Sequence, residues 1–339
     1  MVSLTDVQSS NSRIASALPP GLVAVFVGAT NGIGETTLKQ FAKHARQPRV
    51  YFVGRSQEAG DRIAAECKAL NSEGEYIFIK ADTSLIRTVD DVCRDIKNKE
   101  KSINLLFLST GTLVPHKETP EHLHLATALV HHSRARFIVN LLPLLQQATA
   151  LRRVVSVFGA CKEGRVDTSD LHGWRVSMLS ARGHAASLVT LSLEALAKKA
   201  PDVSFIHAFP GPVKSGIARG TTGAVWFVIK AVFKVVGPLV YIPNQESGER
   251  HLFLATSARY PPGTGEDAAA GVPLAGEVAV ARGTSGKVGS GVYSIDWDGE
   301  SAGPKVEVLL AKFRKEGLVE KVWEHTEEEF RRITGLDAV

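Results

Sequence analysis

Short apolar runs alternate with longer amphipathic segments along most of the chain. The first run, residues 22–27, is unbroken and ends at a glycine, which is typical of a strand buried on both faces of a parallel sheet. Similar runs follow at 50–53, 76–79, 103–108, 154–158 and 203–209. The segments between them carry apolar residues at helical spacing. This alternation predicts an α/β fold: a doubly wound parallel sheet, Rossmann-like, in a single domain.

The less regular parts of the sequence divide the chain further. In chain order the predicted parts are a flexible leader (1–20), a Rossmann-like domain (21–300) with an apolar lid (about 216–245) and a surface loop (about 261–290), and a C-terminal helical extension (301–339). A last strand is expected at 291–296. Three segments, 121–148, 177–199 and 309–333, are each predicted to form one continuous helix.

Composition and charge narrow the class of protein. Of 339 residues 44% are hydrophobic and 22% charged, as in ordinary globular proteins. The basic residues behind the net charge of +5 are scattered, so no nucleic-acid partner is expected. The three cysteines lack zinc-type spacing and fit reduced thiols, and the first twenty residues lack a signal-like apolar run, which favours a cytoplasmic protein. The sequence leaves open whether the protein forms a homo-oligomer.

A glycine-rich segment joins the first predicted strand to the first predicted helix. Its residues are Gly28, Ala29, Thr30, Asn31, Gly32, Ile33 and Gly34. Gly28 permits a tight turn, Gly32 lets the backbone approach a pyrophosphate, and Gly34 lets the helix pack closely on the strand. The free N–H groups and positive dipole end of the helix favour phosphate. The segment therefore predicts a dinucleotide site.

The residue after the second strand distinguishes the two nicotinamide cofactors. That strand ends at Gly54, and Arg55 follows. An acidic residue here would bind the ribose 2′-hydroxyl of NAD, whereas an arginine can hold the 2′-phosphate of NADP with two hydrogen bonds. We therefore expect NADP(H) as the cofactor. The alternative for Arg55 is a solvated surface residue.

The spacing Gly-x-x-x-Gly-x-Gly resembles that of the short-chain dehydrogenase/reductase family, and further motifs agree. They are Asp82 after the third strand, Ser109-Thr110-Gly111 after the fourth, a Leu-Leu-Pro-Leu-Leu run at 141–145 and a Pro-Gly-Pro-Val-Lys-Ser segment at 210–215. Residues 245–248 resemble the retinol-dehydrogenase-like branch, and the likeness covers about 20–260. The resemblance implies that Asp82 contacts the adenine and that the cofactor site includes Ser109, Gly111, Pro210, Gly211 and Val213.

The proton-transfer residues of that family are missing. Its members convert carbonyls and alcohols with a Tyr-x-x-x-Lys pair, a serine and an asparagine, and the lysine lowers the pKa of the tyrosine. In the best register the tyrosine becomes Arg182 and the lysine becomes Ala186. The serine position falls near Gly159, with Ser156 inside the fifth strand, and the asparagine position falls on Val130.

Several residues are candidates to replace the missing tyrosine. They are His184, Arg182, Ser156 and Cys161. Histidine titrates near neutral pH, so His184 suits an acid or base, while Arg182 stays charged and could stabilise an oxyanion. The alternatives are a surface histidine, a surface arginine and a structural thiol. The one literal Tyr-x-x-x-Lys, from Tyr76 to Lys80, lies on the third strand, on the adenine side, and is interpreted as a coincidence.

A histidine pair raises the question of a metal. His131 and His132 lie together on the central helix, but no third ligand occurs at a usable spacing in the sequence. A zinc site needs at least three protein ligands. The sequence therefore predicts no metal site.

An apolar stretch over 224–242 follows the 210–215 motif. Two lysines and a Gly-Pro pair interrupt it, so a membrane-spanning helix ranks last among its interpretations. In the resembled family this region covers the substrate, so Trp226, Phe227 and Phe233 are expected to line a pocket for a bulky apolar ligand. Peripheral membrane contact or a dimer surface are the alternatives.

The leading hypothesis is an NADP(H)-linked oxidoreductase that acts on a hydrophobic carbonyl or alcohol intermediate and has a non-standard proton donor. The sequence resembles divergent members of the family from fungal natural-product biosynthesis, which implies a role in secondary metabolism. The alternatives are a redox-neutral isomerase or cyclase on the same scaffold, and a binding protein without chemistry. The fold alone does not separate the three.

Overall fold

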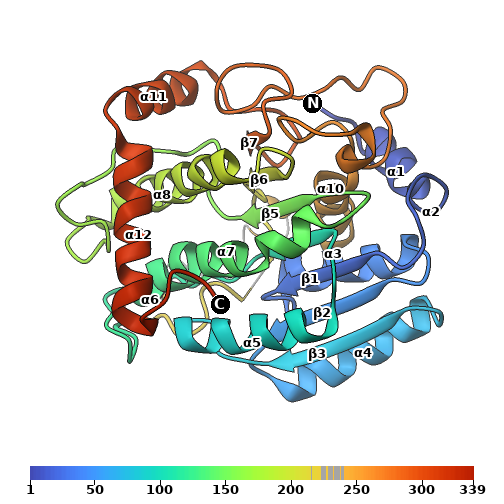
Figure 1. Ribbon diagram of the computed structural model, residues 1–339, viewed down its shortest axis with the longest axis horizontal. Helices are drawn as coiled ribbons and strands as arrows, with labels where there is room; N and C mark the ends of the chain where they lie inside the picture. Colours follow the sequence, from blue (N-terminus) through green and yellow to red (C-terminus); the bar gives the residue numbers. More distant parts are fainter. Residues whose placement is uncertain (215, 223–226, 228–231, 233–236, 238–239) are drawn as a thin grey trace.

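The computed structural model describes residues 1–214, 216–222, 227, 232, 237 and 240–339, and its centre is a seven-stranded parallel sheet (Figure 1). The strands are β1 (Val23–Val27), β2 (Arg49–Gly54), β3 (Glu75–Lys80), β4 (Leu105–Leu108), β5 (Arg153–Val157), β6 (Ser204–Ala208) and β7 (Val292–Ile295). Their order is β3-β2-β1-β4-β5-β6-β7, so the winding reverses between β1 and β4. This reversal is where doubly wound sheets bind ligands. The predicted Rossmann-like α/β class is confirmed.

Helices cover both faces of the sheet because successive strand residues face opposite sides. On β1, Val25 and Val27 belong to one apolar core, and Ala24 and Phe26 belong to the other. The first core is closed by α5 (Ile86–Lys99), α7 (Ser133–Gln146), α8 (Met178–Lys199) and α12 (Leu318–Thr334). The second is closed by α3 (Gly32–His44), α4 (Gln57–Leu70) and α10 (Asn244–Thr256).

The N-terminal segment differs from the flexible leader predicted for residues 1–20. It forms the helices α1 (Leu4–Ser12) and α2 (Ile14–Ala17), and α1 packs on α10. Val7 and Ile14 are buried at 1% exposure each. The amide of Asn11 donates hydrogen bonds to the backbone oxygen (2.9 Å) and the carboxylate (2.6 Å) of Glu249. Buried apolar side chains, with Val2 and Leu18 also in the second core, and one buried amide therefore anchor this segment.

The central helical segment is not the single helix predicted over 121–148. It consists of α6 (Leu125–Thr127), a π-helical turn η1 (Ala128–His132) and α7. A π turn inserts an extra residue into the helix and often marks a functional position. Further along, Arg136 of α7 forms a buried bidentate pair with Asp90 of α5, with distances of 2.6 and 2.7 Å. These contacts fix α7 between the sheet and the last helices.

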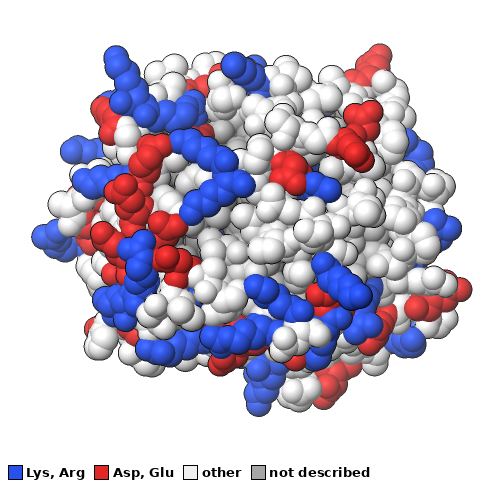
Figure 2. All heavy atoms as spheres, viewed as in Figure 1, with Lys and Arg blue, Asp and Glu red and all other residues white. Residues whose placement is uncertain are grey.

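The C-terminal extension also differs from the single helix predicted over 309–333. It forms α11 (Pro304–Lys315) and α12, which are separated at Gly317, a residue with φ of 70°. α12 packs along α8, and the ion pairs Lys198–Glu320 (2.5 Å) and Lys199–Glu327 (2.8 Å) join the two helices. Figure 2 shows acidic and basic side chains side by side along α12 on this face of the molecule.

The stretch predicted as a surface loop, 261–290, is irregular but partly buried. It contains a short 3₁₀ helix, η2 (Asp267–Ala270), and Val272 and Ala281 pack into the second core. The predicted last strand is present as β7. Within the described part of the chain, no helix combines the length and the apolar character that a membrane crossing requires.

Candidate functional site

The glycine-rich segment between β1 and α3 packs directly on the end of β4. Gly28 has φ of 86°, and a Cβ there would lie 2.8 Å from the backbone nitrogen of Thr110. A Cβ on Gly34 would lie 2.5 Å from Oγ of Ser109, which itself donates to the backbone oxygen of Val27 (3.2 Å). Side chains at these positions would push the two loops apart. The geometry therefore accounts for glycine at both ends of the predicted segment.

The start of α3 is open to an anion. Asn31 is the N-cap residue, has extended backbone angles and makes no side-chain capping hydrogen bond. Gly32, with φ of 61°, and Ile33 form the first positions of the helix. Thr30 packs against the end of β2, where a Cβ on Gly54 would lie 2.3 Å from its Cγ2. The N–H groups of the first helical turn are thus placed to bind phosphate.

The two residues expected to contact the adenosine half follow β2 and β3. Arg55 is exposed, and it has no hydrogen bond or ion pair with the residues that the structure describes. Asp82 is also exposed and accepts hydrogen bonds from the backbone N–H (3.0 Å) and hydroxyl (2.8 Å) of Ser84. An arginine without a protein partner next to a phosphate-binding helix fits a 2′-phosphate ligand.

The one literal Tyr-x-x-x-Lys, from Tyr76 to Lys80, lies on β3, which is an edge strand of the sheet next to β2. The hydroxyl of Tyr76 donates to the backbone oxygen of Asn71 (3.3 Å), and burial raises the pKa of this tyrosine. β2 and β1 separate the pair from β4 and β5.

The positions of the missing serine, tyrosine and lysine meet beside the end of β5. A Cβ on Gly159 would lie 3.3 Å from Cβ of Ala186 and 3.8 Å from Cγ of Arg182. The guanidinium carbon of Arg182 lies 4.9 Å from the ring centroid of Phe209, the residue after β6 that precedes Pro210. Arg182 is exposed, so its charged end reaches solvent at this edge of the sheet.

A second cation at this edge was not found from the sequence. Nζ of Lys162 lies 5.2 Å from the Phe209 ring centroid and 3.1 Å from a carboxylate oxygen of Asp296. Lys162 is contributed by the loop between β5 and α8, and Arg182 by α8. No sequence pattern marks a lysine at this position, because the loop that carries it has no regular spacing.

Ser156 does not face this edge. It is buried within β5, and its Oγ accepts a hydrogen bond from Nη1 of Arg134 (2.8 Å). Arg134 also donates to the backbone oxygens of Val157 (3.0 Å) and Thr110. Burial lowers the pKa of Arg134 to about 9. This arginine, also missed by sequence reasoning, ties the end of β4 to the end of β5 and gives Ser156 a structural role.

His184 also lies away from the position expected of a catalytic acid. It is 2% exposed, its Nδ1 accepts from the backbone N–H of Asp167 (3.2 Å), and its Nε2 lies 3.5 Å from the backbone oxygen of Leu171. Burial lowers its pKa, so it stays neutral at physiological pH. Both ring nitrogens contact the loop between β5 and α8, so the position of His184 does not support the expected role of an acid or base.

A buried network of hydrogen bonds holds the backbone of Gly159 in place. Its backbone N–H donates to Nε2 of His207 (3.1 Å), and Nδ1 of His207 lies 2.8 Å from the hydroxyl of Thr190. Thr190 donates to Glu163 (2.8 Å), so a chain of hydrogen bonds runs from β6 through α8 into the loop after β5. Near this network, burial raises the pKa of Cys161 to about 12, which excludes a thiolate nucleophile at neutral pH.

The predicted lid is only partly described. Trp226 and Phe233 lie outside the described residues, and Phe227 is 74% exposed. On the described side, the backbone N–H of Leu113 donates to the backbone oxygen of Ile217 (3.0 Å), and a Cβ on Gly111 would lie 3.8 Å from Cδ1 of Ile217. An apolar rim, partly exposed, therefore joins the loop after β4 to residues 216–222.

The motif after β6 is held in place by Ile242, near the end of the predicted lid. Gly211 has φ of 70°, and a Cβ there would lie 2.6 Å from Cδ1 of Ile242. Val213 forms a parallel bridge with Ile242, whose N–H donates to the backbone oxygen of Pro212 (2.8 Å). Pro210, Gly211 and Val213 thus form one fixed wall of the candidate site, beside Arg182 and Phe209.

Comparison with known proteins agrees with this geometry. The model of the short chain dehydrogenase family matches residues 22–153. An oxidoreductase of Emericella nidulans is 40% identical over 96% of this chain and 97% of its own length. The short-chain dehydrogenase/reductase SAT2 of Stachybotrys chartarum is 30% identical over 91% of this chain and 92% of its own length.

A solved structure shows the same fold. The alcohol dehydrogenase of the archaeon Thermococcus sibiricus, complexed with 5-hydroxy-NADP, superposes with a TM-score of 0.51 at 18% identity, over 69% of this chain and 89% of that chain. The Rossmann-like sheet, the glycine segment and these relatives together define the class. The chain belongs to the short-chain dehydrogenase/reductase family of oxidoreductases.

Proposed function

We propose that the protein binds NADP(H) and interconverts a carbonyl and an alcohol on a hydrophobic small molecule of fungal secondary metabolism. The observation that carries the proposal is the convergence of Arg182 and Ala186 on Gly159, beside Phe209. The reactive positions of the family are thus brought together, although other residue types occupy them. The full-length fungal relatives, one of them named an oxidoreductase, support the same reaction class.

The described residues fit the cofactor. Gly28 and Gly34 let the segment before α3 pack closely on the loop after β4, the start of α3 is uncapped, and the side chain of Arg55 lacks a partner among the described residues. NADP(H), when bound, supplies or accepts a hydride. The α3 N-terminus would hold the pyrophosphate and Arg55 the 2′-phosphate. The structure of a neighbour complexed with 5-hydroxy-NADP supports the phosphorylated form.

Arg182 occupies the position of the family's tyrosine and would stabilise charge there instead of transferring a proton. A guanidinium does not give up its proton near neutral pH, but it stabilises negative charge on oxygen. In the reductive direction Arg182 would hold the negative charge that develops on the substrate oxygen, and a solvent proton would complete the alcohol. Because Arg182 and Lys162 are exposed, water reaches this edge of the sheet.

The apolar rim supports a hydrophobic substrate. Leu113 and Ile217 are exposed at 39% and 37%, and their segments are hydrogen-bonded to each other at the loop after β4.

All three cysteines are free thiols, which fits the reducing cytoplasm.

The experiment is to incubate the protein with NADPH and a panel of hydrophobic ketones and aldehydes while following the absorbance of the reduced nicotinamide. Oxidation of NADPH that depends on one of these carbonyls supports the proposal. A redox-neutral isomerase or cyclase is the second candidate, and it is favoured because His184 is buried with both ring nitrogens against the loop between β5 and α8. Product formation without any change in that absorbance would replace the first candidate with the second.

A further inference from the structure

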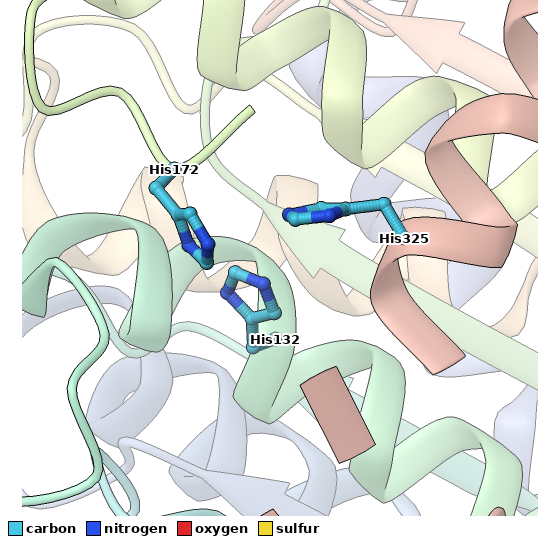
Figure 3. A group of neighbouring side chains, drawn as sticks. All are labelled: His132, His172 and His325. Carbon is cyan, nitrogen blue, oxygen red and sulfur yellow. The ribbon is translucent and has the colours of Figure 1, made fainter. Parts of the chain in front are cut away.

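Three histidines from distant parts of the chain converge on one point. His132 lies in η1, His172 in the loop between β5 and α8, and His325 in α12. One ring nitrogen of each lies within 4.8 Å of the others, and Figure 3 shows the rings directed toward one another from three separate elements. The sequence offered His132 no third ligand at usable spacing, and the fold supplies both missing partners.

Four of the six ring nitrogens in this cluster lack a hydrogen-bond partner within the part of the chain that the structure describes. Both nitrogens of His132, Nδ1 of His172 and Nε2 of His325 are buried atoms without a partner among the described residues. His132 is 1% exposed, so its ring lies away from bulk solvent. Folded proteins rarely leave buried polar atoms unpaired, and a cluster of such atoms points to a bound ion or water.

We propose that His132, His172 and His325 bind a divalent transition-metal ion of the Zn²⁺ class. Imidazole nitrogen suits Zn²⁺ and its neighbours in the series, whereas Ca²⁺ and Mg²⁺ take oxygen ligands. Three atoms separated by 4.8 Å have a common centre about 2.8 Å from each. A zinc–nitrogen bond of about 2.0–2.1 Å therefore requires each ring to move inward by about 0.7 Å. Small side-chain rotations supply such a movement.

Contacts around the cluster hold one of the ligands, His172. Oε1 of Glu329, one turn after His325 on α12, lies 3.8 Å from Nε2 of His172. The hydroxyl of Thr127 donates to the backbone oxygen of His172 (2.7 Å). Metal-binding histidines usually present their second nitrogen to a carboxylate or a backbone oxygen, which fixes the ring and its tautomer. In this arrangement the unpartnered Nδ1 of His172 is left for the metal.

His131 supports the proposed site by joining two of the elements that carry its ligands. Its Nε2 lies 2.9 Å from the hydroxyl of Thr326, the residue after His325. This contact joins η1 to α12 directly beside the cluster. The π turn that contains both His131 and His132 therefore directs one histidine to α12 and the other to the proposed metal.

The proposed site has an open side. A pocket of about 390 Å³ is lined by His172 and His325 together with Asp170, Leu171 and Trp174. Its rim includes Thr168, Ser169 and Arg175, which are exposed, so the pocket communicates with solvent. Three protein ligands and a free fourth position characterise zinc sites that bind water or a small ligand, in contrast to closed structural sites with four protein ligands. We assign the fourth position to the side of this pocket.

The site shares no residue with the proposed hydride-transfer site. Its ligands lie on η1, α12 and the part of the loop around His172, whereas the reaction edge is formed by Gly159, Arg182 and Phe209. The proposal is therefore independent of the cofactor and of the substrate, and it is tested with the metal ion alone.

The test is calorimetric titration of Zn²⁺ into the full-length protein after removal of bound metal with a chelator. We expect one equivalent to bind and the melting temperature to rise with Zn²⁺. Substituting a residue that supports a metal ligand costs about 10–100-fold in metal affinity. Glu329→Gln, which changes such a supporting residue, is therefore expected to cost about 10-fold, and His325→Ala, which removes a ligand, at least about 100-fold. His122→Ala removes an exposed histidine paired with Glu118 and should leave the affinity unchanged.

Co²⁺ gives a second readout that a surface site would not reproduce. Bound Co²⁺ should show the intense visible absorption of a four-coordinate ion, and Zn²⁺ should displace it stoichiometrically. Failure of Zn²⁺ to bind the unmodified protein, or equal binding by His325→Ala and His172→Ala, would overturn the proposal. Circular dichroism spectra and metal-free melting curves of the same variants show whether they fold, so that loss of a ligand is distinguished from loss of structure.

Discussion

The side chain of Arg182 lies over the ring of Phe209, with 4.9 Å between the guanidinium carbon and the ring centroid. Arg182 lies on α8, beside Gly159 in the loop that follows β5. Phe209 begins the turn after β6. An arginine on an aromatic face is held by a cation–π contact of about 0.5–1 kcal/mol at exposed sites. The contact thus orients a permanent positive charge at the edge where the family carries its tyrosine.

This relationship predicts how the reaction responds to substitution. Arg182→Ala is expected to lower kcat by about 10²–10³, with a much smaller effect on KM, because an oxyanion forms only as the reaction proceeds. Arg182→Lys keeps the charge but loses the planar fork, and should recover part of the rate. The matched control is Arg165→Ala, an exposed arginine in the preceding loop. A rise in KM at constant kcat would assign Arg182 to substrate binding instead.

The literal Tyr-x-x-x-Lys gives the opposite expectation. Tyr76→Phe removes a hydroxyl that donates to the backbone oxygen of Asn71 on the outer strand β3. It should leave kcat within a few-fold and cost about 1 kcal/mol of stability. Steady-state kinetics and chemical denaturation measure the two effects separately. A fall in kcat of about 10² or more, the size expected for loss of a general acid, would place the reaction at β3.

The N-terminal helix should contribute measurably to stability. Asn11→Ala removes both hydrogen bonds to Glu249, which is 4% exposed, and leaves its carboxylate buried without this donor. The expected loss is about 1–3 kcal/mol of unfolding free energy. Ser12→Ala, at an exposed neighbouring position, is the control and should change little. Urea denaturation measures both, and equal stability of the two variants would restore the interpretation of 1–20 as a flexible leader.

Stability should fall in mild acid because of a buried histidine on α10. Burial lowers the pKa of His251 from 6.5 to about 4, so the unfolded chain takes up a proton that the folded protein does not. The contribution is complete above pH 6.5 and is lost as the pH falls toward 4. For this shift it amounts to about 3 kcal/mol. Melting temperatures of the unmodified protein and His251→Gln across this range test the prediction.

The comparison between the two proteins isolates the histidine from other titrating groups. The acid-dependent loss should be smaller in His251→Gln, whereas His122→Gln, at an exposed histidine, should follow the unmodified protein. Parallel pH profiles for all three would show that His251 does not carry the effect.

Local patterns sufficed for the cofactor half of the molecule. The unbroken apolar run of β1 and the glycines at 28, 32 and 34 determine a strand, a turn and a helix start from neighbouring residues alone. The register that set Arg182 against the family tyrosine also led to the position where the structure places this residue beside Gly159. In each case the physical cause lies within a few residues of the feature.

Features built from distant segments were not visible in the sequence. Arg134 reaches Ser156 and Thr110 only because β4 and β5 are neighbours in the sheet. His172 and His325 meet His132 only because α12 returns along α8. His184 has the residue type of an acid, but the loop that packs over it decides its role. Periodicity carries no information about such long-range contacts.

The central claim is that this protein has a functional NADP(H) site, in which Arg55 selects the phosphorylated cofactor. Equilibrium titrations of NADPH and NADH against the unmodified protein and Arg55→Ala measure this directly, with Arg94→Ala as the control at an exposed arginine on α5. A charge-assisted contact is worth about 1.5–3 kcal/mol, so NADPH should bind tighter than NADH by about tenfold or more. This preference should disappear in Arg55→Ala and persist in Arg94→Ala. Equal affinities for both dinucleotides in the unmodified protein, or no binding of either, would contradict the account.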